Sequence, residues 1–196
     1  MERTLSQKLA AEFVGTATLI FAGAGAAIAL TRLTASGATN GGGELVVAAL
    51  ANGLAIGVMV TALGHVSGGH FNPAVTLGMI TTLKISVRDG VAYWGAQLAG
   101  AAAAAGILRW AFPQQLWSTA RLGVPAVQNG VSTGQAVVLE AVLTFFLVWV
   151  IFACAVDPEG AFGKVAGLAI GLTITMDVCV GGPFTGAAMN PARWFG

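Results

Sequence analysis

The triplet Asn-Pro-Ala occurs twice in this chain, at 72–74 and at 190–192. Asn is a residue that caps helix N-termini, and Pro suits the first helical position, where its missing N–H is not needed. Each triplet therefore predicts the start of a helix, and each Asn side-chain amide could also donate a hydrogen bond to a passing molecule. The six residues are Asn72, Pro73, Ala74, Asn190, Pro191 and Ala192.

The chain has the composition of a membrane protein. Of its 196 residues 56% are hydrophobic and 9% are charged, and its mean hydropathy is +0.81. A soluble domain carries about 25% charged residues, so these charges are too few to cover a water-facing surface. The net charge of +1, without a basic run, argues against a nucleic-acid partner. Cys154 and Cys179 stand far apart in apolar stretches, so neither a disulfide framework nor a metal-binding spacing is visible.

Five apolar segments are long enough to cross the ~30 Å hydrocarbon core of a bilayer. They cover residues 6–30, 44–64, 89–110, 134–156 and 164–181. Inside lipid such segments form helices, because a helix satisfies its own backbone hydrogen bonds. We therefore predict an all-α, multi-pass integral membrane protein.

Two further apolar stretches are too short to cross. One runs from Asn72 to about Leu83 and the other begins at Asn190, and a Gly-rich segment precedes each. Short, interrupted apolar segments at corresponding positions of two halves are typical of broken helices around a transport pathway. The elements that start at the two triplets are therefore predicted to be half-helices.

The two halves of the chain are related by an internal repeat. The sequence GLAIG at 53–57 recurs at 167–171, 114 residues later, and the two triplets lie 118 residues apart. The segment EFVGT at 12–16 also matches EAVLT at 140–144. Three shared features in the same order indicate a duplication. Because the first half contains three spans, the second half has the opposite orientation, and the repeat is inverted.

We expect a single transmembrane domain over residues 1–196, with repeat one at 1–110 and repeat two at 132–196. The basic residues weakly favour a cytoplasmic N-terminus, since cytoplasmic loops carry an excess of Lys and Arg. With this orientation the cytoplasmic residues are Arg3, Lys8, Lys84, Arg88 and Lys164, and the external ones are Arg32, Arg109 and Arg121.

Inversion would bring the N-termini of the two half-helices together near the middle of the membrane. Both positive dipole ends then face the same place, which presents a barrier to a proton or a cation. Arg193 stands three residues after Asn190, where the first half has Val75. An arginine in the first helical turn opposes the dipole, and a cation at membrane depth is costly, so Arg193 is a functional candidate. The alternative is an arginine that extends to the membrane surface.

Three segments resemble the aquaporin, or major intrinsic protein, family. They are AEFVGT in the first span, GHVSGGHFNPAVTLG and GGPFTGAAMNPAR, and the resemblance covers essentially the whole chain. It implies a bundle of six helices plus two half-helices, usually a homotetramer, with one pore per subunit for water or small neutral solutes. A sixth helix would then follow the second half-helix, but the chain ends at Gly196. We therefore expect an aquaporin-like bundle of five full helices and two half-helices, as a fragment or as a protein without the sixth helix.

Members of this family narrow their pore at a four-residue selectivity filter, which the resemblance carries onto Asn52, Val178, Ala187 and Arg193. Arg193 matches the family pattern. Strictly water-selective members resemble one another in having an aromatic residue and a histidine at the first two positions. We therefore expect a wider constriction, similar to that of vacuolar-type members that resemble channels for ammonia, urea or hydrogen peroxide. Trp194 stands where glycerol facilitators usually have Asp and water channels often have Ser.

Five other ionisable residues lie in or near the spans. Glu12 and Glu140 occupy matched positions, and by the resemblance they are buried acids that bond the loops leading to the half-helices, with a proton relay as the alternative. His65 and His70 flank the first Gly-rich loop, where stabilising hydrogen bonds are favoured over a metal pair or a pH-sensitive loop. Asp177 could line the pore mouth or bond a neighbouring backbone group, and the residues do not decide between the two.

These observations favour a passive channel of the cell (plasma) membrane that passes water and small neutral solutes through the lipid bilayer and excludes protons and cations. Two alternatives stay open. One is a secondary transporter, because broken helices in inverted repeats also serve carriers. The other is a non-conducting structural membrane protein. Saturating flux would favour the carrier, and no flux from a folded oligomer would favour the structural protein. No dinucleotide, P-loop, zinc or triad motif is present, so neither an enzyme nor a cofactor is expected.

Overall fold

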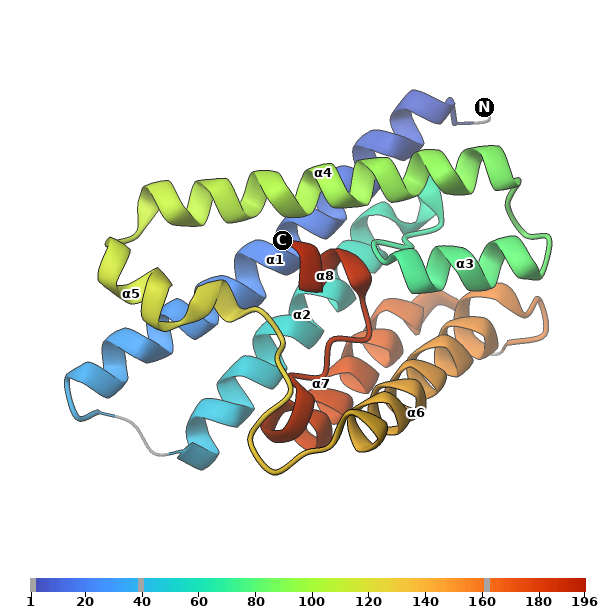
Figure 1. The fold of residues 1–196 in the computed structure, drawn as a ribbon. Coiled ribbons are helices and arrows are strands. Elements are labelled where there is room, and N and C mark those ends of the chain that lie inside the picture. The colour runs from blue at the N-terminus through green and yellow to red at the C-terminus, as the bar shows by residue number, and fades with distance from the viewer. Residues whose placement is uncertain (1–2, 39–40, 161–162) are drawn as a thin grey trace.

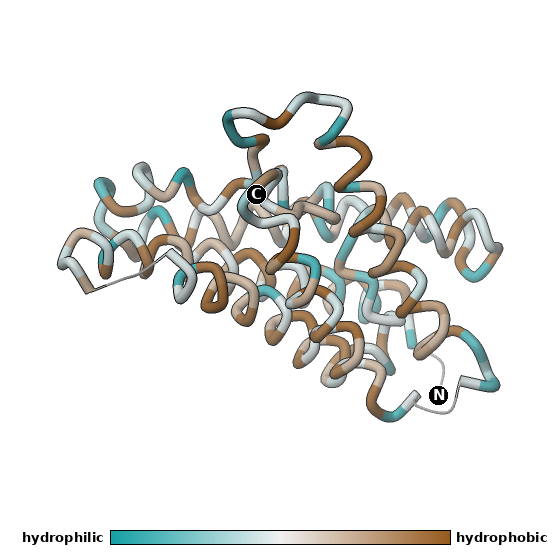
Figure 2. Tube along the Cα trace, turned by 90° about the horizontal axis from the view of Figure 1, so that it is seen from below, coloured by the Kyte–Doolittle hydropathy of each residue, from teal (hydrophilic) through white to brown (hydrophobic). Residues whose placement is uncertain are grey.

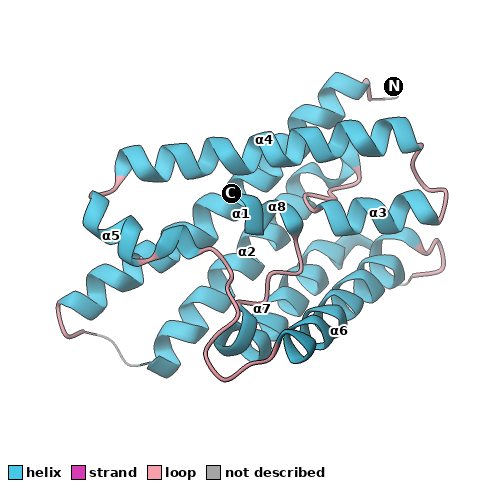
Figure 3. Cartoon of the chain, in the orientation of Figure 1, coloured by secondary structure: helices cyan, strands magenta, loops and turns pink. Residues whose placement is uncertain are grey.

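The computed structural model describes residues 3–38, 41–160 and 163–196, and every regular element in these ranges is a helix (Figure 3). Two short turns extend the long helices: Phe152–Val156 (η2) continues α6 as a π-helical turn, and Gly163–Val165 (η3) leads into α7 as a 3₁₀ turn. The five long helices (Figure 1) are α1 (Leu5–Ala35), α2 (Gly41–Ser67), α4 (Val87–Ala111), α6 (Thr133–Ile151) and α7 (Ala166–Thr185).

The long helices have the length and hydropathy of membrane spans. Counting η2 with α6 and η3 with α7, each of the five is long and apolar enough to cross a membrane, for which about 20 residues are needed. Figure 2 shows apolar residues along the length of these helices. The prediction of an all-α, multi-pass integral membrane protein with five full spans is confirmed.

The two half-helices begin at the prolines of the two triplets. α3 covers Pro73–Thr81 and α8 covers Pro191–Phe195. Asn72 and Asn190 are the N-caps, each with an extended backbone and a side chain that accepts a hydrogen bond from the first turn. α3 ends before Leu83, because Leu83 adopts a positive φ of 59° that turns the chain toward α4. Figure 1 shows the starts of α3 and α8 together near the middle of the bundle.

The segment between α4 and α6 contains structure that the hydropathy pattern did not predict. A short helix, α5 (Gln114–Thr119), is followed by the 3₁₀ turn η1 (Arg121–Gly123). Leu116 and Trp117 of α5 pack against the apolar cluster between α1 and α4. The apolar residues of this segment are too few to form a periodic pattern, and packing against α1 and α4 orders them.

The centre of the bundle is a close crossing of α2 and α7. α1 packs against α2 and α4, α2 against α7, and α7 against α6. At the crossing a Cβ atom added to Gly53 would lie 2.4 Å from the carbonyl oxygen of Gly171, and one added to Gly57 would lie 3.0 Å from that of Gly167. The two copies of GLAIG therefore supply the glycines that allow the two backbones to touch.

The inverted repeat is also visible at the start of each half. Thr4 caps α1 and Ser132 caps α6, each in a capping box with a glutamine three residues later. These caps lie 128 residues apart, as do Glu12 and Glu140. The first helix of each half therefore begins with a capping box and carries its glutamate at the same distance from the cap. The duplication thus includes the helix starts as well as the matching sequence segments.

Candidate functional site

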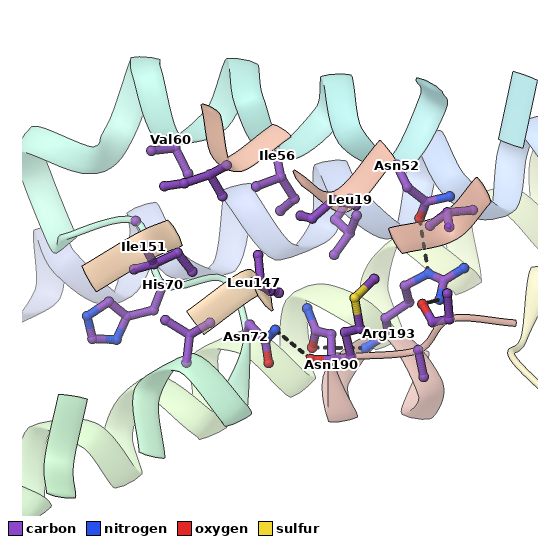
Figure 4. A pocket seen from close by; sticks show the side chains of 18 residues that line it. Leu19, Asn52, Ile56, Val60, His70, Asn72, Leu147, Ile151, Asn190 and Arg193 are labelled. Atoms are coloured by element: carbon purple, nitrogen blue, oxygen red, sulfur yellow. Dashed lines mark hydrogen bonds between the residues drawn. The ribbon is translucent and has the colours of Figure 1, made fainter. Parts of the chain in front are cut away.

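A central cavity lies where α1, α2, α6 and α7 surround the two half-helices (Figure 4). Its volume of about 30 Å³ is small, since by this measure a single water needs roughly 10–15 Å³. Asn52, Val178, Ala187 and Arg193, the four predicted filter positions, all line it, together with the triplet residues Asn72 and Asn190. The cavity thus brings together six predicted residues from four elements and from the segment before α8, and its size suits molecules as small as water.

One side of the cavity is an apolar wall, of which only Val178 was predicted from the sequence. The signal was present in the repeat: Leu19 and Leu147 lie 128 residues apart, and Ile56 and Ile170 occupy the same place in the two copies of GLAIG. Apolar groups bind a passing solute weakly, so such a wall does not hold it. The wall consists of Leu19, Ile56, Val60, Leu147, Ile151, Ile170, Ile174 and Val178.

The two Asn side chains join the half-helices to each other. The Oδ1 atom of Asn72 accepts from the N–H of Ala74 at 2.8 Å, and its Nδ2 donates to the carbonyl of Met189 at 2.9 Å. The Oδ1 atom of Asn190 accepts from the N–H of Ala192 at 2.9 Å, and its Nδ2 donates to the carbonyl of Phe71 at 3.0 Å. Each Asn therefore caps its own half-helix and bonds the chain that leads into the other.

The residue before each triplet has a strained backbone. Phe71 has a φ of 48° and Met189 a φ of 49°, a left-handed conformation that costs a residue with a side chain roughly 1–2 kcal/mol. This conformation turns each carbonyl toward the opposite Asn amide. Gly15 makes room for the first of these turns, because a Cβ atom there would lie 2.2 Å from the ring of Phe71.

Glu12 is fully buried and bonds the loop that leads to α3. Its Oε1 accepts from the Ser67 hydroxyl at 2.6 Å and from the N–H of His70 at 3.0 Å. Its Oε2 accepts from the N–H of Phe71 at 2.7 Å and from the Gln97 amide at 2.8 Å. One carboxylate therefore satisfies two backbone and two side-chain donors, which compensates for its removal from water.

Glu140 makes the corresponding contacts in the second half. Its Oε1 accepts from the Thr185 hydroxyl and, at 2.9 Å, from the N–H of Ala188. Its Oε2 accepts from the N–H of Met189 at 2.9 Å. Glu140 is only partly buried, and it makes three of these bonds where Glu12 makes four.

Arg193 is held against the cavity wall. Its Nε donates to the Oδ1 of Asn52 at 3.0 Å, and its Nη1 donates to the carbonyls of Gly186 at 3.0 Å and Ala187 at 2.7 Å. Figure 4 shows the side chain inside the cavity with Asn52 above it. The guanidinium therefore stays within the bundle and does not extend to the membrane surface.

The predicted loop histidines lie in different surroundings. His65 is exposed in the last turn of α2 and does not line the cavity. His70 lines the cavity, its Nδ1 lies 3.1 Å from the hydroxyl of Thr76, and its ring stacks edge-on against Tyr93. Burial lowers the pKa of His70 to about 4, so the imidazole is neutral near pH 7. In the described part of the chain no three His, Cys, Asp or Glu side chains could share a metal ion.

Two residues left open by the sequence lie outside the cavity. Asp177 is 1% exposed, does not line the cavity, and its Oδ2 has no hydrogen-bond partner among the described residues. Trp194 is 62% exposed and lines a side pocket beside Glu140 and Ala74.

Several supporting residues were missed because single polar residues in a span have no local pattern. Tyr93 donates its hydroxyl to the carbonyl of Ser67 at 2.8 Å, and the Trp94 indole donates to the carbonyl of Pro73 at 3.1 Å. Gln97 donates to Glu12 and, at 3.0 Å, to Thr76. These residues of α4 share one helical stretch and hold α3 and its loop in place.

The profile of the family described as Major intrinsic protein matches residues 1–196. Aquaporin TIP2-1 of Arabidopsis thaliana is 43% identical over 189 residues, which is 95% of this chain and 72% of that protein. Aquaporin TIP1-1 of Zea mays is 43% identical over 187 residues, with the same two coverages. The X-ray structure of the aquaglyceroporin from Plasmodium falciparum superposes with a TM-score of 0.84 and 25% identity, over 98% of this chain and 79% of that one.

Membrane-spanning helices in an inverted repeat surround a water-sized cavity, an arrangement that suits a membrane channel. The family profile and the similarity to the two plant proteins agree with this class. The chain belongs to the major intrinsic protein family, and it is a channel for water or small solutes. The resemblance seen in the sequence is confirmed.

Proposed function

We propose that the chain is a passive water channel that also admits small neutral solutes and excludes protons and cations. The observation that carries this proposal is the central cavity at which the N-termini of α3 and α8 meet, with Arg193 on its wall. Water is the best-supported permeant, because the cavity of about 30 Å³ suits molecules of its size.

The wall chemistry supports rapid passage. One side is apolar, and the polar side chains that line the rest of the cavity are few: the amides of Asn52, Asn72 and Asn190, His70 and Arg193. Each Asn amide uses one of its two N–H groups on a carbonyl, so the second is free to donate to a water oxygen. A water molecule thus exchanges hydrogen bonds at a few points and is not held by the rest of the wall.

Exclusion of cations rests on the positive charge of Arg193, which interacts electrostatically with the Glu140 carboxylate without a direct contact. Arg193 forms no ion pair with a described residue, since its contacts are to an amide and two backbone carbonyls. Its charge adds to the positive end of α3 in a narrow, low-dielectric passage. We expect Arg193→Val to increase proton leakage more than water permeability, measured with a pH-sensitive dye in vesicles under a potassium diffusion potential. Arg193→Lys, which keeps the charge, is the control, and equal leakage in all three proteins would contradict this assignment.

The solute range rests on Asn52 and Val178. Asn and Val at these positions leave a constriction that is less specific for water than one with an aromatic ring and a histidine. The solutes to test are therefore ammonia, urea and hydrogen peroxide. Because the cavity is small, we expect urea to pass more slowly than ammonia. Asn52→Phe combined with Val178→His should reduce urea and ammonia flux while water still passes. Unchanged urea and ammonia flux would contradict the hypothesis.

The primary experiment is osmotic shrinkage of vesicles that contain the purified chain, followed by stopped-flow light scattering. We expect shrinkage faster than in protein-free vesicles and weakly dependent on temperature. Shrinkage at the lipid rate, from protein shown to be helical and inserted, would overturn the proposal. A carrier would instead give solute flux that saturates with concentration.

Assembly, orientation and location are part of the same proposal. We infer a homotetramer in the cell membrane with a cytoplasmic N-terminus, and one channel domain over residues 1–196. Large exposed apolar side chains, such as Leu54, Phe145 and Trp149, need cover from lipid or from another subunit. Cross-linking in native membranes tests the tetramer, and labelling of a cysteine placed at Ser6 from one side of intact cells tests the orientation.

Glu12 and Glu140 are proposed to support the loops and not to relay protons. Each oxygen of both carboxylates accepts at least one hydrogen bond from the loops or from α4. Neither acid lines the central cavity. A relay needs a group in contact with the transported proton, and these acids face the protein.

A further inference from the structure

We propose that Asn52 is a positioning residue that holds the Arg193 guanidinium in one orientation, and that this contact sets which neutral solutes pass the constriction. The inference rests on the proposed channel function. It gives Asn52 an active role, whereas the sequence suggested only the absence of a ring at this position. The two residues lie 141 positions apart in the chain.

The orientation of the Asn52 amide is set by its two partners. Its Nδ2 donates to the carbonyl of Ala48 at 2.9 Å, and its Oδ1 accepts from the Nε of Arg193 at 3.0 Å. If the amide were turned over, its nitrogen would face the Nε–H donor and its oxygen would face a carbonyl oxygen. Both contacts would then be repulsive, so only the observed orientation satisfies the site.

The contacts of Arg193 leave one edge of the guanidinium available. The group has five N–H donors, of which Nε uses one on Asn52 and Nη1 uses two on the carbonyls of Gly186 and Ala187. Nη2 has no hydrogen-bond partner among the described residues, and Arg193 lines the cavity. The two N–H groups of Nη2 are therefore the ones that a passing solute oxygen can meet.

Gly23 provides the space that Asn52 occupies. A Cβ atom added to Gly23 would lie 2.5 Å from the Oδ1 of Asn52 and 3.0 Å from its Cγ. The amide is the flexible end of a side chain, so an alanine at 23 would displace it and not the backbone. Gly23, Asn52 and Arg193 thus form a chain of contacts from α1 through α2 to α8.

Loss of the Asn52 contact releases Nε inside a site with few other acceptors. The guanidinium then populates other rotamers, some of which place it across the passage. When the passage narrows, the permeability of a solute larger than water falls more than the permeability of water does. The quantity that reports this change is the ratio of hydrogen peroxide to water permeability, because a smaller amount of folded protein lowers both rates and leaves the ratio unchanged.

Four variants test whether the hydrogen bond between Asn52 and Arg193 is responsible for the effect. Asn52→Leu keeps the volume and removes the hydrogen bond, and Gly23→Ala displaces the amide without changing its chemistry. Asn52→Asp restores an acceptor for Nε, although it loses the donor to Ala48. Gly106→Ala is the control for a glycine in a helix, because a Cβ atom there meets nothing within 4 Å.

We expect Asn52→Leu and Gly23→Ala to lower the permeability ratio by at least about threefold, which the loss of one hydrogen bond to a charged group can readily produce. Asn52→Asp, which keeps an acceptor for Nε, should lose less of the ratio than Asn52→Leu, and Gly106→Ala should stay within about twofold of the unmodified chain. An unchanged ratio in Asn52→Leu and Gly23→Ala, with water still conducted, would overturn the proposal. If one of the two variants fails to fold, the other provides the test.

A second measurement keeps this inference separate from the proposed function. If the unmodified chain shrinks vesicles only at the lipid rate, the channel proposal fails, but the contact can still be tested. Thermal unfolding in detergent is compared for Asn52→Leu, Arg193→Lys and the double variant. Losses in the unfolding midpoint that do not add would support a direct contact. Losses that add within error would overturn it.

Discussion

Asn72 and Asn190 are bonded to each other's half-helix and not only to their own. The Nδ2 of Asn72 donates to the carbonyl of Met189, and the Nδ2 of Asn190 donates to the carbonyl of Phe71. The acceptors belong to Phe71 and Met189, and both of these residues have left-handed backbones. The exchange therefore fixes the distance between the two helix starts at the cavity, and it offsets the strain of the turns that precede them.

Asn72 can be tested by separating its capping bond from its cross-link. Asn72→Ser keeps a side-chain oxygen suited to an N-cap but cannot reach Met189, and Asn72→Ala loses both contacts. We expect Asn72→Ala to lower the free energy of unfolding by about 2–3 kcal/mol and Asn72→Ser by about half of that. Thermal unfolding in detergent measures both. Equal losses in the two variants would show that the cross-link to Met189 contributes little.

The two buried acids should differ in their importance. A glutamine has one acceptor oxygen and presents N–H groups where Glu12 and Glu140 accept hydrogen bonds. We expect Glu12→Gln to destabilise the chain by about 3–5 kcal/mol, in the range found when a buried charged network is broken, and Glu140→Gln to cost less. The reason is that Glu12 is fully buried with four donors, whereas Glu140 is partly buried with three. The yield of folded protein and its unfolding midpoint give the order, and a larger effect at Glu140 would contradict it.

Substitution by alanine should have opposite effects at a glycine of the α2–α7 crossing and at an open glycine of α4. At Gly95 of α4 a Cβ atom meets nothing within 4 Å, so Gly95→Ala should stabilise its helix by about 0.5–1 kcal/mol. At Gly53 the added atom would lie 2.4 Å from a backbone oxygen, so Gly53→Ala should destabilise by about 1–3 kcal/mol. Unfolding midpoints measured in the same detergent give the signs. Stabilisation by Gly53→Ala would mean that the helices are not in backbone contact.

His70 predicts a channel that is insensitive to pH near neutrality. Burial lowers the pKa of His70 to about 4, against about 6.5 for a free imidazole. The ring therefore gains a proton only well below pH 5, and we expect water permeability to stay constant between pH 8 and pH 5.5. Stopped-flow shrinkage across this range measures it, with His65→Gln as the control for the exposed histidine. A transition near pH 6.5 that disappears in His70→Gln would contradict the assignment.

The local elements of this protein follow from neighbouring residues. Hydropathy alone located the five spans, and the two triplets located the starts of α3 and α8, because capping and membrane insertion depend on residues adjacent in the chain. The repeat of GLAIG indicated the duplication, and the three spans of the first half indicated its inversion. The 3₁₀ turn and helix between α4 and α6 were missed, since only docking of Leu116 and Trp117 against other helices orders that segment.

The contacts within the site were decided by tertiary structure. The sequence by itself determined the membrane class, the spans, the half-helix starts and the family motif. It did not show that Asn52 bonds Arg193, that Gly23 leaves room for it, or that Leu19 and Ile56 form a wall. These relationships depend on how helices from distant parts of the chain are rotated and aligned. That alignment arises from the packing of whole helices, such as the glycine crossing of α2 and α7, and no stretch of neighbouring residues contains it.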